Sequence, residues 1–132
     1  MATMNLKTTD FTTTIDKPGI VLFDCWAPWC APCRHFAPIY ERVSEKFPDV
    51  TFTKVNVDEE PAIAQSFGVQ GIPTLVAFRD GVPLFSQAGM LPDKVLEDLI
   101  TQLKALDMED VRKKIAEADK AGAGAEGDAE PG

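Results

Sequence analysis

The chain has 132 residues, of which 45% are hydrophobic and 26% are charged, and this fits one globular domain with a single core. Its net charge of −8 argues against nucleic acid or an anionic membrane as a partner. No run approaches the roughly 20 apolar residues that a membrane helix needs. The N-terminus lacks the apolar core of a signal peptide, so we expect a cytoplasmic protein.

The chain opens with short elements and then a long apolar run. Residues 4–6 fit a short strand, and residues 8–14 fit a short helix capped by threonine. Residues 20–26 are apolar except for Asp24 and Cys25, which is typical of a strand buried on both faces at the centre of a partly parallel sheet.

A helical pattern follows the apolar strand. Residues 31–47 carry apolar side chains three and four positions apart, and Pro38 inside this helix should kink it. Residues 51–57 alternate and are β-branched, which predicts a strand. Residues 60–67 predict a short helix with proline in its first turn. This alternation favours parallel strands joined by crossover helices.

The second half of the chain predicts a hairpin and a final helix. Residues 75–78 and 82–88 are strand-like, and Asp80-Gly81 between them is a strong turn signal. Pro83 suggests that the return strand lies at a sheet edge. An amphipathic helix starts at Pro92. The whole pattern predicts an α/β domain whose mixed central sheet is flanked by helices on both faces.

The end of the chain differs in composition from the rest. Residues 1–106 form the predicted domain, and residues 107–120 form an amphipathic helical extension with Asp107 as its N-cap. We expect this extension to continue or pack on the last helix of the domain, with a partner or dimer contact as the alternative. Residues 121–132 contain alanine, glycine, acidic residues and one proline, which predicts a disordered acidic tail.

The stretch Trp-Ala-Pro-Trp-Cys-Ala-Pro-Cys, residues 26–33, lies where the apolar strand gives way to a helix. Cys30 takes the helix N-terminus, where the helix dipole and free N–H groups favour a thiolate. Cys33 lies one turn later on the same face. We therefore expect Cys30 to be the exposed, attacking sulfur and Cys33 to be the shielded, resolving sulfur. Pro32 fixes the helix start, and Ala31 limits the backbone freedom that a glycine would have.

Other readings of these cysteines are weaker. The pair could be a structural thiol pair. Cys25, Cys30, Cys33 and His35 could supply four zinc ligands, and the cysteine spacing also resembles part of an iron–sulfur pattern that needs a fourth cysteine. The chain has only three, and Cys25 should point into the core as a small hydrophobe, with a regulatory thiol as its alternative. We therefore expect no bound metal.

Asp24 is unusual because it stands within an apolar strand. A carboxylate there loses hydration, which raises its pKa unless it is paired. Because Asp24 precedes the helix that carries the cysteines, we interpret it as a buried proton acceptor for Cys33. The alternative is a structural aspartate at the end of a strand.

With these residues in view, residues 4–106 resemble thioredoxin. The family pattern Asp-Phe-Trp-Ala-x-Trp-Cys-Gly-Pro-Cys stands here as Asp24-Cys25-Trp26-Ala27-Pro28-Trp29-Cys30-Ala31-Pro32-Cys33. Residues 54–58, residues 71–74 and Gly89 also match family motifs. Ala31 replaces the usual glycine, and Cys25 replaces an aromatic residue. His35 follows the cysteine pair, whereas disulfide isomerases have a histidine between the cysteines.

The resemblance implies a thioredoxin fold and a thiol–disulfide oxidoreductase that reduces protein disulfides through a reversible Cys30–Cys33 disulfide. It implies no bound cofactor and a thioredoxin reductase that supplies electrons from NADPH. The partners would be this reductase and disulfide-containing proteins, and we expect a monomer. A binding subunit without turnover, or an oxidant or isomerase, are the alternative functions.

The resemblance also implies roles for single residues. Pro73 should follow a cis peptide bond and face the cysteines. Lys54 should tune the site together with Ala31 and Pro32, Trp26 should pack against the active-site loop, and Pro38 should be the helix-kinking proline. A shallow apolar surface around Cys30 should hold an extended substrate segment, and its residues are Trp29, Val69, Gly71, Ile72, Pro73, Gly89 and Met90.

Overall fold

The computed structural model describes the backbone of residues 2–129 and the side chains of residues 2–120. Its centre is a sheet of five strands, in the order β1-β3-β2-β4-β5. They are β1 (Thr3–Asn5), β2 (Ile20–Trp26), β3 (Thr51–Asn56), β4 (Thr74–Arg79) and β5 (Val82–Ala88). The first three pair in parallel, whereas β4 pairs antiparallel with both β2 and β5. The predicted mixed sheet, with the apolar strand at its centre and the return strand at its edge, is confirmed.

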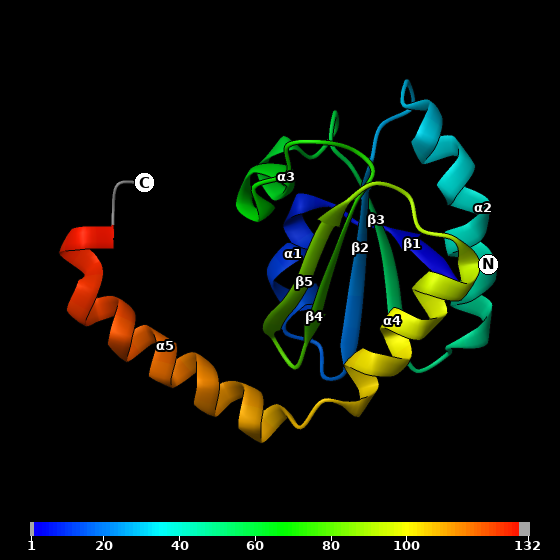
Figure 1. Ribbon diagram of the computed structural model, residues 1–132. Coiled ribbons are helices and arrows are strands. Elements are labelled where there is room, and N and C mark those ends of the chain that lie inside the picture. The colour runs from blue at the N-terminus through cyan, green and yellow to red at the C-terminus, as the bar shows by residue number, and fades with distance from the viewer. Residues whose placement is uncertain (1, 130–132) are drawn as a thin grey trace.

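Helices cover both faces of this sheet (Figure 1). On one face, α2 (Ala31–Lys46) and α4 (Asp93–Ala105) pack on Leu22 and Leu75. The opposite face carries two shorter helices and a 3-10 turn, which are α1 (Phe11–Ile15), α3 (Pro61–Phe67) and η1 (Thr8–Asp10). Because side chains alternate along a strand, β2 contributes apolar side chains to the core on both faces of the sheet. This explains its continuous apolar sequence.

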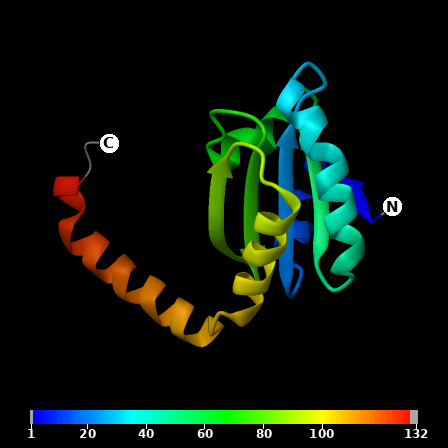
Figure 2. The ribbon, with the colours of Figure 1, turned by 45° about the vertical axis from the view of Figure 1, so that its right-hand side comes forward.

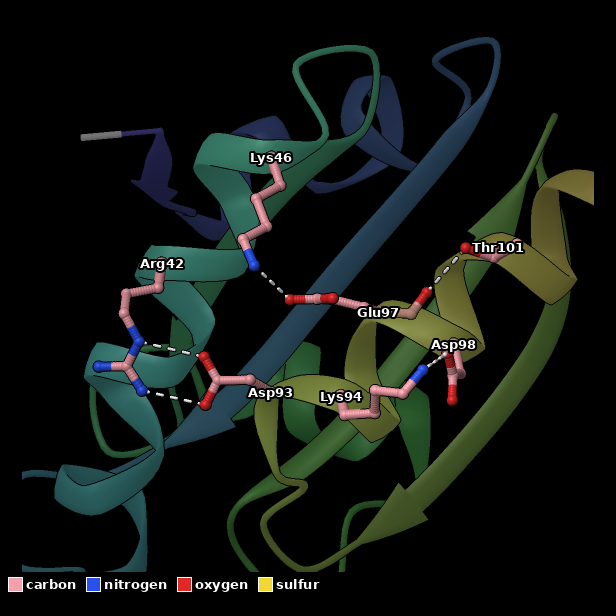
Figure 3. A network of polar contacts seen from close by, with 7 residues as sticks. All are labelled: Arg42, Lys46, Asp93, Lys94, Glu97, Asp98 and Thr101. Carbon is pink, nitrogen blue, oxygen red and sulfur yellow. Dashed lines mark hydrogen bonds and ion pairs between the residues drawn. The ribbon is translucent and has the colours of Figure 1, made fainter.

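Ion pairs join the two helices on the first face (Figure 3). Arg42 of α2 donates from Nε and Nη2 to the two carboxylate oxygens of Asp93, at 3.1 and 3.0 Å. One turn further along each helix, Lys46 Nζ lies 2.8 Å from Glu97 Oε2. These exposed pairs bridge α4 and α2 above the buried side chains that the two helices share, and α2 is the helix that begins at the cysteines.

The C-terminal extension is a separate helix, α5 (Met108–Ala129). Asp107 is its N-cap as predicted, because Asp107 Oδ1 accepts from the backbone N–H groups of Glu109 and Asp110. The helix continues through most of the predicted disordered tail, whose alanines have the highest helix propensity. Residues 130–132 of that tail lie outside the described residues.

The expectation that α5 packs along α4 is wrong. Figures 1 and 2 show α5 leaving the domain in a different direction from α4 and running away from the sheet. Met108 is buried and Val111 is half-buried, whereas each residue from 112 to 120 is exposed. None of the helices in the described part of the chain combines the length and apolar character that a membrane crossing requires.

Candidate active site

Cys30 and Cys33 form a disulfide at the start of α2, with their Cα atoms 5.3 Å apart. Cys30 is the N-cap residue, and its sulfur accepts the backbone N–H of Cys33 at 3.2 Å. Ala31 and Pro32 form the exposed first turn between them. The predicted placement of a sulfur among free N–H groups at a helix N-terminus is therefore present.

The predicted difference in exposure between the two sulfurs is not found in the disulfide form. Cys30 is 4% exposed and Cys33 is 2% exposed. Both pack with Ala27, and the partly buried Ile72 and Trp26 lie against them. The preceding loop shields Cys30 more than sequence spacing indicates, because Ala27 folds under the disulfide while Trp29 points outward.

A distant loop meets the disulfide as the resemblance implied. The Ile72–Pro73 peptide bond is cis, and the carbonyl oxygen of Ile72 lies 3.7 Å from Cys30 Sγ. Thr74 Oγ1 donates to the carbonyl of Gly71, and the Gly89 N–H donates to the carbonyl of Pro73 at 2.8 Å. The segment before β4 and the segment after β5 are thereby held together beside Cys30.

Beside this loop lies a shallow groove of about 400 Å³. Trp29 is 67% exposed at its edge, and its indole N–H donates to the Asp58 carboxylate at 3.0 Å. The groove is lined by Trp29 and by the predicted loop residues Val69, Gln70, Gly71 and Ile72. Two further lining residues, Val57 and Ala64, were not predicted to belong to this surface.

The other predicted surface residues lie next to the groove. Gly89 and Met90 are exposed in the segment after β5, and Pro73 is buried behind the carbonyl of Ile72. A Cβ atom built on Gly71 would lie 3.9 Å from Cβ of Ala88, so this segment is adjacent to Gly71. Asp58 was missed as the partner of Trp29, although it belongs to the matched motif of residues 54–58.

Asp24 is buried beneath α2, the helix that begins at the cysteines. It is 1% exposed and shares its face of β2 with Leu22, which packs against α2. Among the residues that the structure describes, neither carboxylate oxygen has a hydrogen-bond partner. Burial raises the pKa of Asp24 from 3.8 to about 7, and the positive charge of Lys54 opposes this rise. A carboxyl group in this state can take up or release a proton near neutral pH.

Lys54 faces Asp24 from the neighbouring strand. The two residues are partners in the β2–β3 register, and the Lys54 ammonium lies 5.0 Å from the ring centroid of Trp26. Trp26 is partly buried, and its indole N–H is buried without a hydrogen-bond partner. Trp26 also packs against the buried cluster of Ala27, Cys30 and Cys33, so its ring lies between Lys54 and the disulfide.

The remaining candidate ligands lie apart from the disulfide. Cys25 is fully buried on the opposite face of β2, in a cluster with Val21 and Phe23. Burial, followed by the nearby Asp24 charge, raises the pKa of the Cys25 thiol to about 12, so it stays protonated. His35 and Pro38 are exposed on α2. Within the described residues, no three His, Cys, Asp or Glu side chains are grouped so that they could hold a metal ion.

The residues of this site lie within the part of the chain that is similar to known proteins. The Thioredoxin family model matches residues 2–102, which includes the cysteine pair, Asp24 and the cis-proline loop. The chain belongs to the thioredoxin family. It is 44% identical over 116 residues to the "Putative thioredoxin 2" of Streptomyces coelicolor, covering 88% of this chain and 87% of that one.

Two further relatives agree with this assignment. The thioredoxin of Alicyclobacillus acidocaldarius is 46% identical over 97 residues, which are 73% of this chain and 92% of that protein. The solved structure of a mutant thioredoxin from Halobacterium salinarum NRC-1 superposes with a TM-score of 0.73 at 33% identity, covering 80% of this chain and 93% of that one. The thioredoxin fold is thereby confirmed.

Membership of the family identifies the chemistry of the disulfide. This protein is a thiol–disulfide oxidoreductase, and Cys30 and Cys33 are its redox-active pair. Thioredoxins need no bound cofactor, and the family implies protein disulfides as substrates and a thioredoxin reductase as electron donor. The family model ends at residue 102, before α5 begins.

Proposed function

We propose that this thioredoxin reduces protein disulfides with Cys30 as the nucleophile and Cys33 as the resolving thiol. In the dithiol form, the Cys30 thiolate attacks one sulfur of the substrate disulfide. A bond forms between Cys30 and that sulfur, the substrate S–S bond breaks, and the other substrate sulfur leaves as a thiolate that takes a proton.

The second step closes the internal disulfide. The Cys33 thiol gives its proton to the Asp24 carboxylate, and the resulting thiolate attacks Cys30 Sγ. The mixed disulfide breaks, the second substrate thiolate leaves, and the Cys30–Cys33 disulfide remains. Two electrons have passed from the protein dithiol to the substrate.

The contact between the Cys33 N–H and Cys30 Sγ supports this order. A backbone donor at a helix N-terminus stabilises negative charge on the N-cap sulfur, so Cys30 is the thiol that ionises more readily. Cys33 is the first buried residue inside the helix. It therefore needs a base, and Asp24 with a pKa of about 7 is suited to accept its proton. Ala31, Pro32 and Lys54 tune the redox potential through the first turn of α2 and the charge facing Asp24.

The substrate segment binds across the residues that border Cys30. Trp29 and Val69 offer apolar contact, and Gly71 and Ile72 offer backbone carbonyl and N–H groups at the groove. Pro73 gives this loop its shape through the cis bond that precedes it. Gly89 and Met90 border the other side of the same loop. Trp26 supports the loop from within, and Pro38 bends α2. We further propose that the chain acts as a cytoplasmic monomer and that its reductase draws electrons from NADPH.

The experiment that tests these roles is mixed-disulfide trapping with insulin as substrate. In the Cys33→Ser variant, the substrate should remain covalently bound to Cys30, and mass spectrometry of the peptide that contains residue 30 would detect it. The Cys30→Ser variant should form no adduct and should not reduce insulin. If Cys30→Ser trapped the substrate and Cys33→Ser did not, the two roles would be reversed.

A second measurement separates a reductant from an oxidant. The reduction potential of the Cys30–Cys33 pair should lie at or below the cytosolic glutathione poise, roughly −220 to −320 mV depending on the method. A potential far above this range would refute the reductase assignment.

A further inference from the structure

Helix α5 lies outside the residues that the family model matches, and it has no part in the redox site. The end of α4, from which α5 starts, is nevertheless anchored to the domain. Arg79 Nη1, at the end of β4, donates to the carbonyls of Leu103 and Leu106 at 2.8 and 3.0 Å. Arg112 of α5 lies 3.8 Å from Asp80 in the turn between β4 and β5. The helix therefore starts at the foot of this hairpin.

Beyond its first turn, α5 carries an apolar stripe whose later residues are exposed. The stripe residues Met108, Val111, Ile115 and Ala118 are three or four positions apart, so they share one face of the helix. Met108 is 7% exposed, but Ile115 is 39% exposed. The opposite face is polar and includes Lys113, Glu117 and Lys120.

An unfilled apolar groove of about 440 Å³ lies along the same hairpin. It contains no ionisable side chain. Its lining is made of six apolar residues and two serines: Phe67, Val76, Phe78, Pro83, Leu84 and Phe85, with Ser66 and Ser86. Figures 1 and 2 both show α5 standing off from the domain on the side of the edge strand β5. Groove and stripe thus belong to the same side of the molecule.

We propose that α5 closes onto this groove of its own chain, with Val111, Ile115 and Ala118 as the inserted side chains. The pivot is the junction of Leu106 and Asp107 between α4 and α5. The lengths agree, because Val111 to Ala118 spans about 10 Å of helix and Pro83 to Ser86 spans about 10 Å of strand. Closure leaves the polar face of α5 in solvent and covers part of the open edge of the sheet, which is one of the ways in which proteins protect edge strands from aggregation.

The chain's own helix is favoured over that of a second copy. Met108 and Arg112 already place the first turns of α5 beside the hairpin, and a short tether gives a millimolar effective concentration. A second copy would bring together two chains that each carry a net charge of −8. The groove contains no charged residue to offset that repulsion.

Nuclear Overhauser measurements on the full-length oxidised chain test this closure. The Ile115 methyl groups, assigned with an Ile115→Val variant, should show cross-peaks to ring protons of Phe67, Phe78 or Phe85. The Ile115→Asp variant should shift the Leu84 methyl resonances away from their native positions, because the groove loses its occupant. Retained insulin reduction by this variant would show that its domain is folded.

Two matched controls accompany these variants. Ala116→Asp places the same charge on α5 outside the stripe, and it should leave the Leu84 resonances in place. Ser86→Asp charges the groove and should abolish the cross-peaks, whereas Gln87→Asp charges the neighbouring exposed residue and should not. Absence of the cross-peaks in the native chain would overturn the closure. Cross-peaks found only between labelled and unlabelled chains in a mixed sample would overturn the intramolecular assignment in favour of a second copy.

Discussion

The Asp24→Asn variant should lose most of the dependence of stability on pH that the native chain shows between about pH 4 and pH 8. Asp24 is 1% exposed and has no hydrogen-bond partner within the described part of the chain, so its ionised form is disfavoured in the folded state. The unfolded chain hydrates the carboxylate and has no such preference. Asparagine has a similar shape and does not ionise, so the variant isolates the cost of the charge.

The magnitude follows from the pKa of Asp24, which burial raises from 3.8 to about 7. A pKa raised in the folded state means that the folded chain binds the proton more tightly. The resulting stability is fully present below about pH 4 and is lost as the pH rises through about 7. A rise of about three pH units corresponds to ~4 kcal/mol at about 1.4 kcal/mol for each unit.

Urea unfolding of the oxidised native chain and of Asp24→Asn, at pH steps from 4 to 8.5, measures this effect. The native free energy of unfolding should fall by about 4 kcal/mol relative to that of the variant across the range. Other carboxyl groups titrate equally in both chains, so their contributions cancel in the difference. A difference that stays constant with pH would refute the assignment of a raised pKa to Asp24, and with it the physical basis for its role as a base.

Three further outcomes follow from the same structure. Cys25 is fully buried with a thiol pKa of about 12, so iodoacetamide should label it only after the chain is unfolded. Peptide mass spectrometry would detect the label, and labelling of the folded chain as fast as that of an exposed thiol would contradict the burial of Cys25. Tyr40→Phe removes the buried hydrogen bond to the Thr53 carbonyl and should cost about 1–3 kcal/mol of unfolding free energy, with an unchanged urea midpoint as the contrary result. Gly89→Ala forces a Cβ atom onto a backbone with φ +105 and should cost about 1–3 kcal/mol while raising KM for insulin; an unchanged Tm and KM would show that this conformation does not matter.

Much of the fold could be predicted because local signals agreed with the tertiary environment. The run from Ile20 to Trp26 is apolar on both sides, and the structure places helices on both sides of that strand. Pro83 predicted the edge strand correctly. Proline lacks a backbone N–H, and an edge strand tolerates this where the missing N–H would face solvent. The direction of α5 was not predictable, because it depends on Arg79 and Asp80, which lie far from it in the sequence.

The site could be predicted only in part from the sequence, because it too depends on residues that are far apart in the chain. The helix start supplied the sulfur positions, whereas the groove also depends on Val57 and Ala64, which lie in other elements of the chain. Small or neutral residues of this kind carry no chemical signal of their own. Asp58, the hydrogen-bond partner of Trp29, ends a motif that the sequence had already matched. A sequence pattern does not show, however, that two residues 29 positions apart form a hydrogen bond.

Because the two sulfurs are almost equally buried in the disulfide, exposure alone does not distinguish an attacking sulfur from a resolving one. Their neighbours differ more. Cys30 Sγ accepts a backbone N–H at the helix N-terminus and borders the carbonyl of Ile72 at the edge of the groove. Cys33 lies inside the helix, under which an unpaired carboxyl group is buried. We therefore infer that electrostatics sets the order of the proposed reaction: Cys30 ionises with the help of the helix, and Cys33 ionises only when Asp24 takes its proton.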